Sequence, residues 1–296
     1  MESISFSQFM ANALYDPVKG YYSRTPQIGR KGDFFTAVSV GSSFGQIIAY
    51  QVVEAWYALD NPEPFHLIEQ GAHDGSLAKD IMEELKLLEP DCFHAVQMIL
   101  IEPLDSLRKL QSEKLRELSV PLQYFKSWDE VPANSLHGFF YSNELVDSFP
   151  VDLVTFQNGK WFEKRVAIDP TSTGWMLHLE EIKKDDPLQG FLERIPSIEG
   201  YTTEIHRQIE PWMTSVLQGL KAGVILIVDY GYPESQYYMK ERTCGTLQTY
   251  RLHEKSDDPL VDVGEQDITA HVNFTMLYQS ALHQGANLIG CTDQGR

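Results

Sequence analysis

The chain has 296 residues, of which 43% are hydrophobic and 22% charged, a composition that argues against a disordered or fibrous protein. Its 24 Lys and Arg and 42 Asp and Glu give a net charge of -18, which repels phosphate backbones and anionic membrane surfaces. We therefore expect no nucleic-acid partner and favour a cationic one, although solubility alone explains the charge equally well.

Cysteine content and hydropathy bear on the compartment. Cys92, Cys244 and Cys291 are too few and too scattered for a disulfide framework or a zinc knuckle, which indicates a reducing compartment and no metal. The longest aliphatic run, at 224–228, is far shorter than the roughly 20 residues that span a bilayer, so no membrane insertion is expected. The N-terminus shows neither a signal peptide nor a transit peptide, which predicts a mature, cytoplasmic protein.

The N-terminal residues predict a helix followed by a long loop. Ser5 and Gln8 have capping-box spacing, apolar residues recur after them at helical intervals, and an Asp-Pro pair ends the pattern. Residues 15–36 are rich in glycine, aromatic and basic residues and have no period, which is typical of a long ordered loop. A second helix ends before the Asn-Pro pair at 61–62.

Short apolar runs then alternate with amphipathic helices. The predicted strands are FHLIE at 65–69, MILIE at 98–102, LQYF at 122–125 and GFFYS at 138–142. Strands separated by helices indicate βαβ units, so the predicted fold class is α/β with a mainly parallel, doubly wound sheet.

Residues 151–180 interrupt this alternation with three strand-like runs separated by turn signals, which predicts a small antiparallel β insertion. The pattern that follows predicts a long helix over 205–220, kinked at Pro211 and ended by Gly223. A buried strand at 224–228 then resumes the parallel pattern.

Acidic residues and a glycine turn lie at the predicted carboxyl ends of strands, where ligands bind in open α/β sheets. The first strand ends in Glu69 and leads into a turn with Gly71 and Gly75 that opens a helix. Such a turn exposes backbone N–H groups to a carboxylate or a phosphate. The second strand ends in Glu102, an acceptor for paired ribose hydroxyls, at a distance from the turn that fits a nucleotide site.

The turn does not match the dinucleotide fingerprint G-x-G-x-x-G, and its Asp74 would repel a diphosphate. S-adenosylmethionine has no phosphate and carries a sulfonium cation, so an acidic turn preceded by Glu69 suits this cofactor better. A tight strand-to-helix connection without a ligand is the alternative interpretation.

Four groups of motifs lie in order along nearly all of the chain. They are YDPVKGYYS with GRKGDFFT, LIEQGAHDGSLAKDI, SNELVDSFPV, and DYGYP followed by GTLQTYRLH and GEQDITAHVNF. Together they resemble the MidA-like class I methyltransferases, a family that includes the mitochondrial complex I assembly factor that methylates protein arginine. The resemblance implies an S-adenosylmethionine-dependent methyltransferase with a Rossmann-like fold, an N-terminal helical and loop cap over the cofactor, and a protein substrate such as a respiratory-complex subunit.

The resemblance also implies cofactor-binding residues. It matches Glu69, Gly71 and Gly75 to the cofactor turn and Glu102 to the ribose-binding acid. Further cofactor-binding positions are Asn143 after the fourth strand and Gly32, Asp33 and Phe34 in the covering loop. Trp128 follows the third strand, where an adenine is sandwiched in such folds, and a simple helix cap is its alternative role.

Two departures from the family pattern stand out. Ala72 and His73 occupy positions that usually hold Pro and Gly, and the chain ends at CTDQGR where relatives usually continue to a final strand. We expect either a truncated chain or a differently built edge of the sheet. The predicted division is a cap with the covering loop at 1–60, the first part of the core at 61–150, the antiparallel insertion at 151–200 and the second part of the core at 201–296.

Acidic residues at or just beyond strand ends are the substrate-side candidates. A guanidinium stays charged at neutral pH and is recognised by planar, bidentate carboxylates. The candidates are Glu144, Asp147, Asp229, Glu265 and Asp267. His271 is predicted as a catalytic proton acceptor, and a histidine that caps or packs locally is the more frequent alternative.

The leading functional prediction is therefore methyl transfer to a protein arginine. An NAD-dependent oxidoreductase is a second hypothesis, against which the missing third glycine argues. A third is a non-catalytic assembly factor that kept the fold and lost activity, for which His73 and the short C-terminus are the motivation.

Overall fold

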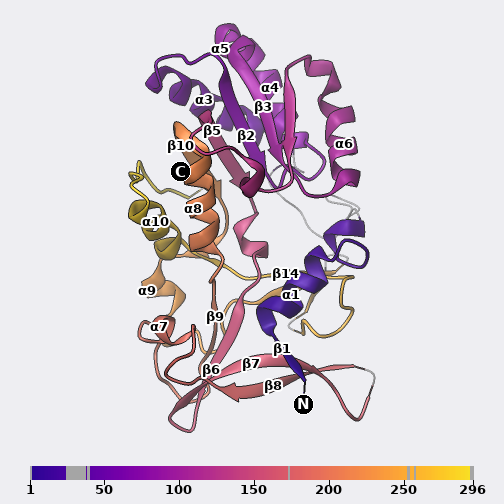
Figure 1. Cartoon of the computed structure of the whole chain (residues 1–296), viewed down its shortest axis with the longest axis vertical. Coiled ribbons are helices and arrows are strands. Elements are labelled where there is room, and N and C mark those ends of the chain that lie inside the picture. The colour runs from indigo at the N-terminus through magenta and orange to yellow at the C-terminus, as the bar shows by residue number, and fades with distance from the viewer. Residues whose placement is uncertain are drawn as a thin grey trace.

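The fold contains two large sheets. The computed structural model describes residues 2–24, 38, 41–172, 174–251, 254–256 and 258–293. Figure 1 shows a helix-covered sheet at one end of the long axis and a second sheet at the other. Helix α1 (Phe6–Tyr15) and strand β14 (Asp267–Thr269) lie between them.

The first sheet has five parallel strands in the order β10-β5-β2-β3-β4. Its strands are β2 (Phe65–Gln70), β3 (Val96–Ile101), β4 (Leu122–Phe125), β5 (Leu136–Asn143) and β10 (Leu220–Val228). The helices around it are α3 (Ser43–Ala58), α4 (Ser76–Leu88), α5 (Pro90–Ala95), α6 (Asp105–Leu115), α8 (Ile209–Gly219) and α10 (Phe274–His283). This arrangement confirms the predicted α/β class with a parallel central sheet.

The three central strands β2, β3 and β5 are buried on both faces, which explains why they appear in the sequence as short apolar runs, whereas the outer strands β4 and β10 are partly exposed. Successive side chains of a strand point to opposite faces. In β2, Leu67 packs with apolar side chains of α3 and α4, whereas Ile68 packs with α8. No helix in the described part of the chain is long and apolar enough to cross a bilayer.

The second sheet is antiparallel. Its strands are β1 (Ser3–Ser5), β6 (Asp152–Gln157), β7 (Lys160–Ile168), β8 (Trp175–Glu181) and β9 (Thr202–Ile205). The hairpin between β6 and β7 turns at Asn158 and Gly159, both at positive φ, as the turn signal predicts. Strands β1 and β9 join this sheet from outside the predicted insertion, and the division of the chain into segments stays a prediction.

Several short elements complete the structure. They are α7 (Gln189–Leu192), α9 (Glu234–Tyr237), β11 (Gly231–Tyr232), β12 (Gln248–Arg251), β13 (Glu254–Ser256) and β15 (Val272–Asn273). Strands β13, β12 and β14 form one small sheet, and β11 and β15 form another.

The predicted long helix over 205–220 is wrong at both ends. Ile205 ends strand β9, and α8 begins only at Ile209. Pro211 lies in the first turn of α8, where a backbone N–H has no partner within the helix, so the helix continues through it. Gly223 does not end the helix but lies inside β10.

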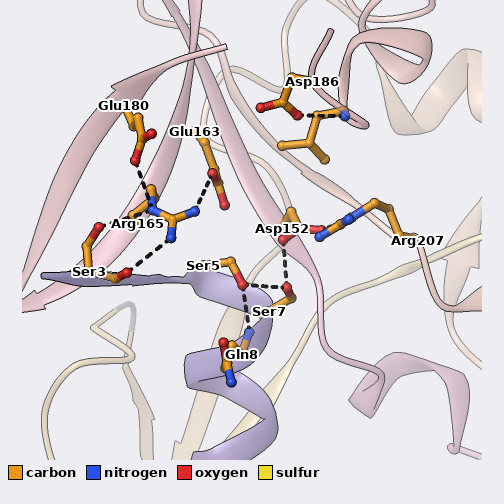
Figure 2. A network of polar contacts seen from close by, with 11 residues as sticks. Ser3, Ser5, Ser7, Gln8, Asp152, Glu163, Arg165, Glu180, Asp186 and Arg207 are labelled. Atoms are coloured by element: carbon orange, nitrogen blue, oxygen red, sulfur yellow. Dashed lines mark hydrogen bonds and ion pairs between the residues drawn. The ribbon is translucent and has the colours of Figure 1, made fainter. Parts of the chain in front are cut away.

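A network of polar contacts fastens the N-terminal segment to the antiparallel sheet (Figure 2). Arg165 on β7 is paired with two glutamates and donates to Ser3 Oγ of β1 at 3.1 Å. Asp152 on β6 is buried and accepts from Ser7 Oγ at 2.6 Å and from Arg207 Nε at 2.5 Å. These contacts fix the start of α1, whose other end reaches the candidate site.

Candidate functional site

The turn after β2 has the left-handed backbone conformation at three positions. The angle φ is +79° at Gly71, +45° at His73 and +82° at Gly75. A Cβ atom at Gly71 would also lie 3.1 Å from Leu145 Cδ1, so glycine is required there for conformation and for space. His73, at a position where the family pattern has glycine, takes a conformation that costs a residue with a Cβ about 1 to 2 kcal/mol.

Asp74 is engaged within the protein, and its role toward a cationic cofactor stays a prediction. One carboxylate oxygen accepts the N–H of Ser76 at 3.0 Å, at the start of α4. The other is bonded to the Lys114 ammonium, which also donates to Ser76 Oγ at 2.6 Å. Burial opposes ionisation, but the bonds from Lys114 and Ser76 outweigh it and lower the pKa of Asp74.

Glu102 lies at the carboxyl end of β3, beside the glycine turn. Its Oε1 accepts the N–H of Leu104 at 2.8 Å, and its Oε2 accepts from Gln111 Nε2 at 3.3 Å. The same Gln111 nitrogen donates to the carbonyl of His73 at 2.8 Å, so one side chain ties the acid to the turn. Burial raises the pKa of Glu102, and these bonds oppose the rise.

The turn and Glu102 fit S-adenosylmethionine. Each Glu102 oxygen accepts one hydrogen bond in the structure, and a carboxylate oxygen has a second lone pair that a ribose hydroxyl can use. The turn at Gly71 and Gly75 opens α4, where backbone N–H groups favour the carboxylate of an amino acid. Gln111, which the sequence analysis missed, places these two parts of the site relative to each other.

Two further predicted cofactor residues are buried. Glu69 is 3% exposed and accepts the Tyr141 hydroxyl at 2.9 Å, and burial raises the pKa of Glu69 to about 8. Trp128 packs in the core against Phe140 and donates its indole N–H to Gln70 Oε1 at 2.8 Å. The structure thus gives Trp128 a packing role, and its contact with an adenine stays a prediction.

We expect Glu69→Gln to stabilise the protein increasingly as pH rises. The pKa of Glu69 is raised in the folded chain, so its contribution to the free energy of unfolding is fully present below the ordinary pKa and is lost as pH rises through about 8. Glutamine does not ionise, so the variant avoids this loss. The rise of the pKa from 4.5 to about 8 corresponds to about 5 kcal/mol, which is the upper limit of the gain. Chemical unfolding at pH 5 and pH 8 measures it. A gain that is equal at both pH values, or equal to that of the exposed Glu113→Gln, contradicts this expectation.

The turns after β5 and β10 are bonded to each other. Because these strands are parallel neighbours, Asn143 and Val228 end them at the same edge of the sheet. The N–H of Glu144, which has φ of +48°, donates to the carbonyl of Val228 at 2.9 Å. Asp229 in turn accepts the N–H groups of Val146 at 2.9 Å and Asp147 at 3.2 Å.

Strand β14 brings a further acid to this edge. The N–H of Ala270, just after β14, donates to the carbonyl of Asp147 at 2.9 Å, and Tyr22 donates its hydroxyl to Asp267 Oδ1 at 3.0 Å. Burial raises the pKa of Tyr22, and the charges of Asp267 and Asp147 add to the rise. The structure therefore brings Glu144, Asp147, Asp229 and Asp267 together, and we call these four residues the acidic cluster.

Glu265 does not belong to the acidic cluster. Its carboxylate forms an exposed ion pair with Arg251 at 3.0 Å, and Arg251 also pairs with Asp262. The sequence analysis grouped Glu265 with the substrate-side acids because it lies close to Asp267 in the chain. The structure separates the two residues, because Asp267 is buried and Glu265 faces solvent.

Burial disfavours the ionised form of three acids of the cluster, Glu144, Asp147 and Asp229. Burial raises the pKa of Glu144 to about 7, with a contribution from the nearby Asp147, and burial raises the pKa of Asp147 to about 6. Burial and the charge of Asp147 also raise the pKa of Asp229 well above its usual value. Within the described ranges, Glu144, Asp147 and Asp229 form no ion pair with Lys or Arg. The described residues also contain no group of three or more His, Cys, Asp and Glu arranged to hold a metal.

His271 borders the acidic cluster through Tyr230. Their rings lie 5.3 Å apart, edge to face, and the Tyr230 hydroxyl is bonded to Asp147. The backbone of His271 accepts from His206 Nε2 at 2.9 Å and donates to Thr246 Oγ1 at 3.0 Å. These contacts place the ring beside the cluster, and its role as a proton acceptor stays a prediction.

The cofactor turn and the acidic cluster are neighbours. The side chain of Leu145, between Glu144 and Asp147, lies against Gly71. Asn143 lies at the same edge, and its buried Oδ1 accepts no hydrogen bond from the described residues. The predicted covering-loop residues Gly32, Asp33 and Phe34 lie outside the described residues.

Two tyrosines of the N-terminal segment, Tyr15 and Tyr22, lie beside the acidic cluster. The rings of Tyr15 and Tyr22 stack at 5.4 Å, and Tyr15 donates its hydroxyl to the carbonyl of Ser148 at 2.9 Å. Tyr22 stands in the motif YDPVKGYYS, but its partner Asp267 comes from a distant part of the chain. The motif resembles the family pattern, but only the fold shows which acid Tyr22 contacts.

Known proteins resemble the chain over most of its length. Residues 47–292 match the family model described as "Putative S-adenosyl-L-methionine-dependent methyltransferase". The "Protein arginine methyltransferase NDUFAF7 homolog, mitochondrial" of Drosophila melanogaster is 24% identical, over 99% of this chain and 70% of the relative. The Bos taurus "Protein arginine methyltransferase NDUFAF7, mitochondrial" is 28% identical, over 96% of this chain and 67% of the relative.

A solved structure agrees with these relatives. A crystal structure of a "likely methyl transferase" from Burkholderia thailandensis, bound to S-adenosyl-homocysteine, is 30% identical with a TM-score of 0.88. The match covers 97% of this chain and 74% of that chain. S-adenosyl-homocysteine is what remains of S-adenosylmethionine after methyl transfer, so the structural match points to the same cofactor as the glycine turn and Glu102.

Proposed function

Since the chain belongs to the family of S-adenosyl-L-methionine-dependent methyltransferases whose model matches residues 47–292, we propose that its substrate is an arginine side chain of a protein. The acidic cluster carries this proposal. Carboxylates from the turns after β5 and β10 and from β14 meet beside the cofactor turn. Burial opposes the ionised form of Glu144 and Asp147, and a guanidinium offers a positive charge and paired N–H donors that match carboxylates.

The chain's own residues would bind and orient both reactants. S-adenosylmethionine supplies a methyl group that its sulfonium already activates for in-line displacement. Glu102 would hold the ribose, and the acidic cluster would orient the guanidinium toward the methyl group. The guanidinium nitrogen that gains the methyl group must lose a proton. Glu144, whose pKa is raised by burial to about 7, is suited to accept it near neutral pH.

Methyl transfer from labelled S-adenosylmethionine tests this proposal. Peptides with a single arginine and matched peptides with lysine in its place are incubated with the protein, and mass spectrometry locates the methyl group. We expect methylation of arginine and not of lysine. Calorimetry should show binding of S-adenosylmethionine and not of NAD. Cofactor binding without transfer to any peptide or cell-extract protein would favour the alternative of a non-catalytic assembly factor.

The substrate protein and the compartment are further proposals. The resemblance to a complex I assembly factor suggests a respiratory-complex subunit as the methylated protein, and the arginine methyltransferase relatives support a protein substrate. A cytoplasmic location stays a prediction, and the animal relatives are named as mitochondrial. Mapping of methylated arginines in cells with and without the protein identifies the substrate, and fractionation identifies the compartment.

A further inference from the structure

Three of the four polar atoms of Asp147 are fixed by neighbouring segments. Its N–H donates to Asp229 Oδ2 at 3.2 Å, its carbonyl accepts the N–H of Ala270 at 2.9 Å, and its Oδ2 accepts the Tyr230 hydroxyl. The fourth atom, Oδ1, is buried and accepts no hydrogen bond from the described residues. A buried carboxylate oxygen without a donor is unfavourable, so this atom is suited to meet a donor on a ligand.

Tyr230 is itself held in place at both ends. Its N–H donates to Asp229 Oδ1 at 2.9 Å, directly after β10. Its ring lies against the ring of His271 at 5.3 Å and nearly perpendicular to it. The hydroxyl that reaches Asp147 is therefore positioned by the backbone and by ring packing, not by a freely moving side chain.

We propose that Tyr230 is a positioning residue, whose hydroxyl holds Asp147 Oδ2 so that Oδ1 faces the substrate guanidinium. This inference rests on the proposed function. Tyr230 does not contact the reacting atoms in this account but acts through Asp147. A phenylalanine in its place keeps the ring and its contact with His271 and removes only the hydroxyl.

The electrostatic surroundings of Asp147 make this hydroxyl important. Among the described residues, the titratable groups around Asp147 are Glu144 after β5, Asp229 and Tyr230 after β10, Asp267 on β14, Tyr15 on α1, Tyr22 after α1, Tyr250 on β12 and His271 before β15. None of them is a lysine or an arginine. Burial raises the pKa of Asp147 to about 6, and the hydrogen bond from Tyr230 opposes that rise. Without this bond, a larger share of Asp147 is protonated near neutral pH.

The test is the pH dependence of kcat/KM for a single-arginine peptide in the wild type, Tyr230→Phe and Tyr232→Phe. We expect the acidic limb of the Tyr230→Phe profile to move to higher pH by about one unit, the equivalent of one hydrogen bond. Its activity should partly recover at alkaline pH, and its affinity for S-adenosylmethionine should equal that of the wild type. Tyr232→Phe is the matched control, because the Tyr232 ring also contacts His271, at 5.2 Å, and no hydroxyl bond joins it to Asp147 in the described structure.

Each outcome decides the inference. A Tyr230→Phe profile that superposes on the wild type, or a loss that is equal at every pH, overturns the positioning role. If the wild type itself methylates no arginine, the proposed function fails and the inference fails with it. Should Tyr230→Phe not fold, Asp147→Asn replaces it: the limb near pH 6 should disappear, whereas a limb near pH 7 from Glu144 should remain. A limb near pH 6 that persists in Asp147→Asn overturns the inference.

Discussion

Replacement of Glu102 by alanine is expected to weaken binding of S-adenosylmethionine roughly ten- to a hundredfold, because a hydrogen bond to a charged group is worth about 1.5 to 3 kcal/mol. The loss has two parts in this structure. The ribose hydroxyls lose their acceptor, and Gln111 loses the partner that holds it between β3 and the carbonyl of His73. Isothermal titration calorimetry with the folded variant measures the affinity.

The control for this experiment is Glu113→Ala. Glu113 lies on the same helix as Gln111. Its side chain is exposed, whereas that of Glu102 is buried. Its replacement should leave the affinity within a factor of two, because exposed charges contribute little. Equal affinities of the wild type and a folded Glu102→Ala variant would remove Glu102 from the cofactor site.

The parallel sheet could be predicted from the sequence because its central strands are buried on both faces and therefore consist of short apolar runs between amphipathic helices. The partly exposed edge strand β4 was still predicted, from the run LQYF, at the bounds that the structure has. The N-terminal helix was also predictable, since its start depends on a local contact. Ser5 accepts the N–H of Gln8 at 3.1 Å, as the capping-box spacing indicates.

Elements that depend on distant pairing were missed. Strand β1 has three residues and β9 has four, too few for a periodic pattern, and each forms by pairing with a strand of the antiparallel sheet. The apolar Ile205 fits a helical period by chance and was assigned to the wrong element. Pro211 was interpreted as a kink because a sequence does not show that α8 begins only two residues before it.

The site residues fall into the same two groups: those that follow predicted strands, and those whose partners are distant in the chain. Glu102, Glu144 and Asp147 follow predicted strands, and parallel strands place their carboxyl ends at one edge, so their proximity could be inferred. Gln111 and Tyr230 could not be identified, because each acts through a partner that only the fold brings near. The partner of Asp74 could not be identified for the same reason, since Lys114 lies on another helix. The placement of Asp267 on β14 beside Asp147 was the least secure step, and the structure supports it.

Glu144→Gln is expected to leave binding of S-adenosylmethionine unchanged and to lower kcat/KM for an arginine peptide about a hundredfold, the equivalent of 2 to 3 kcal/mol. The amide keeps the shape of the side chain and the strained backbone at φ of +48°. It removes the negative charge that a guanidinium needs and the group with the pKa near 7 that can accept a proton. Rate measurements under single-turnover conditions, with binding measured separately, test both parts of this expectation.

Glu265→Gln is the matched control for this variant. Sequence position alone gave Glu265 and Glu144 the same role, but the structure leaves Glu265 in an exposed ion pair with Arg251. Glu265→Gln should therefore retain the kcat/KM of the wild type. If both variants behave like the wild type, the acidic cluster does not receive the substrate and the arginine assignment rests on the relatives alone. If Glu144→Gln and Glu265→Gln lose activity equally, the loss results from the change in net charge and not from the acidic cluster, because Glu265 lies outside the cluster.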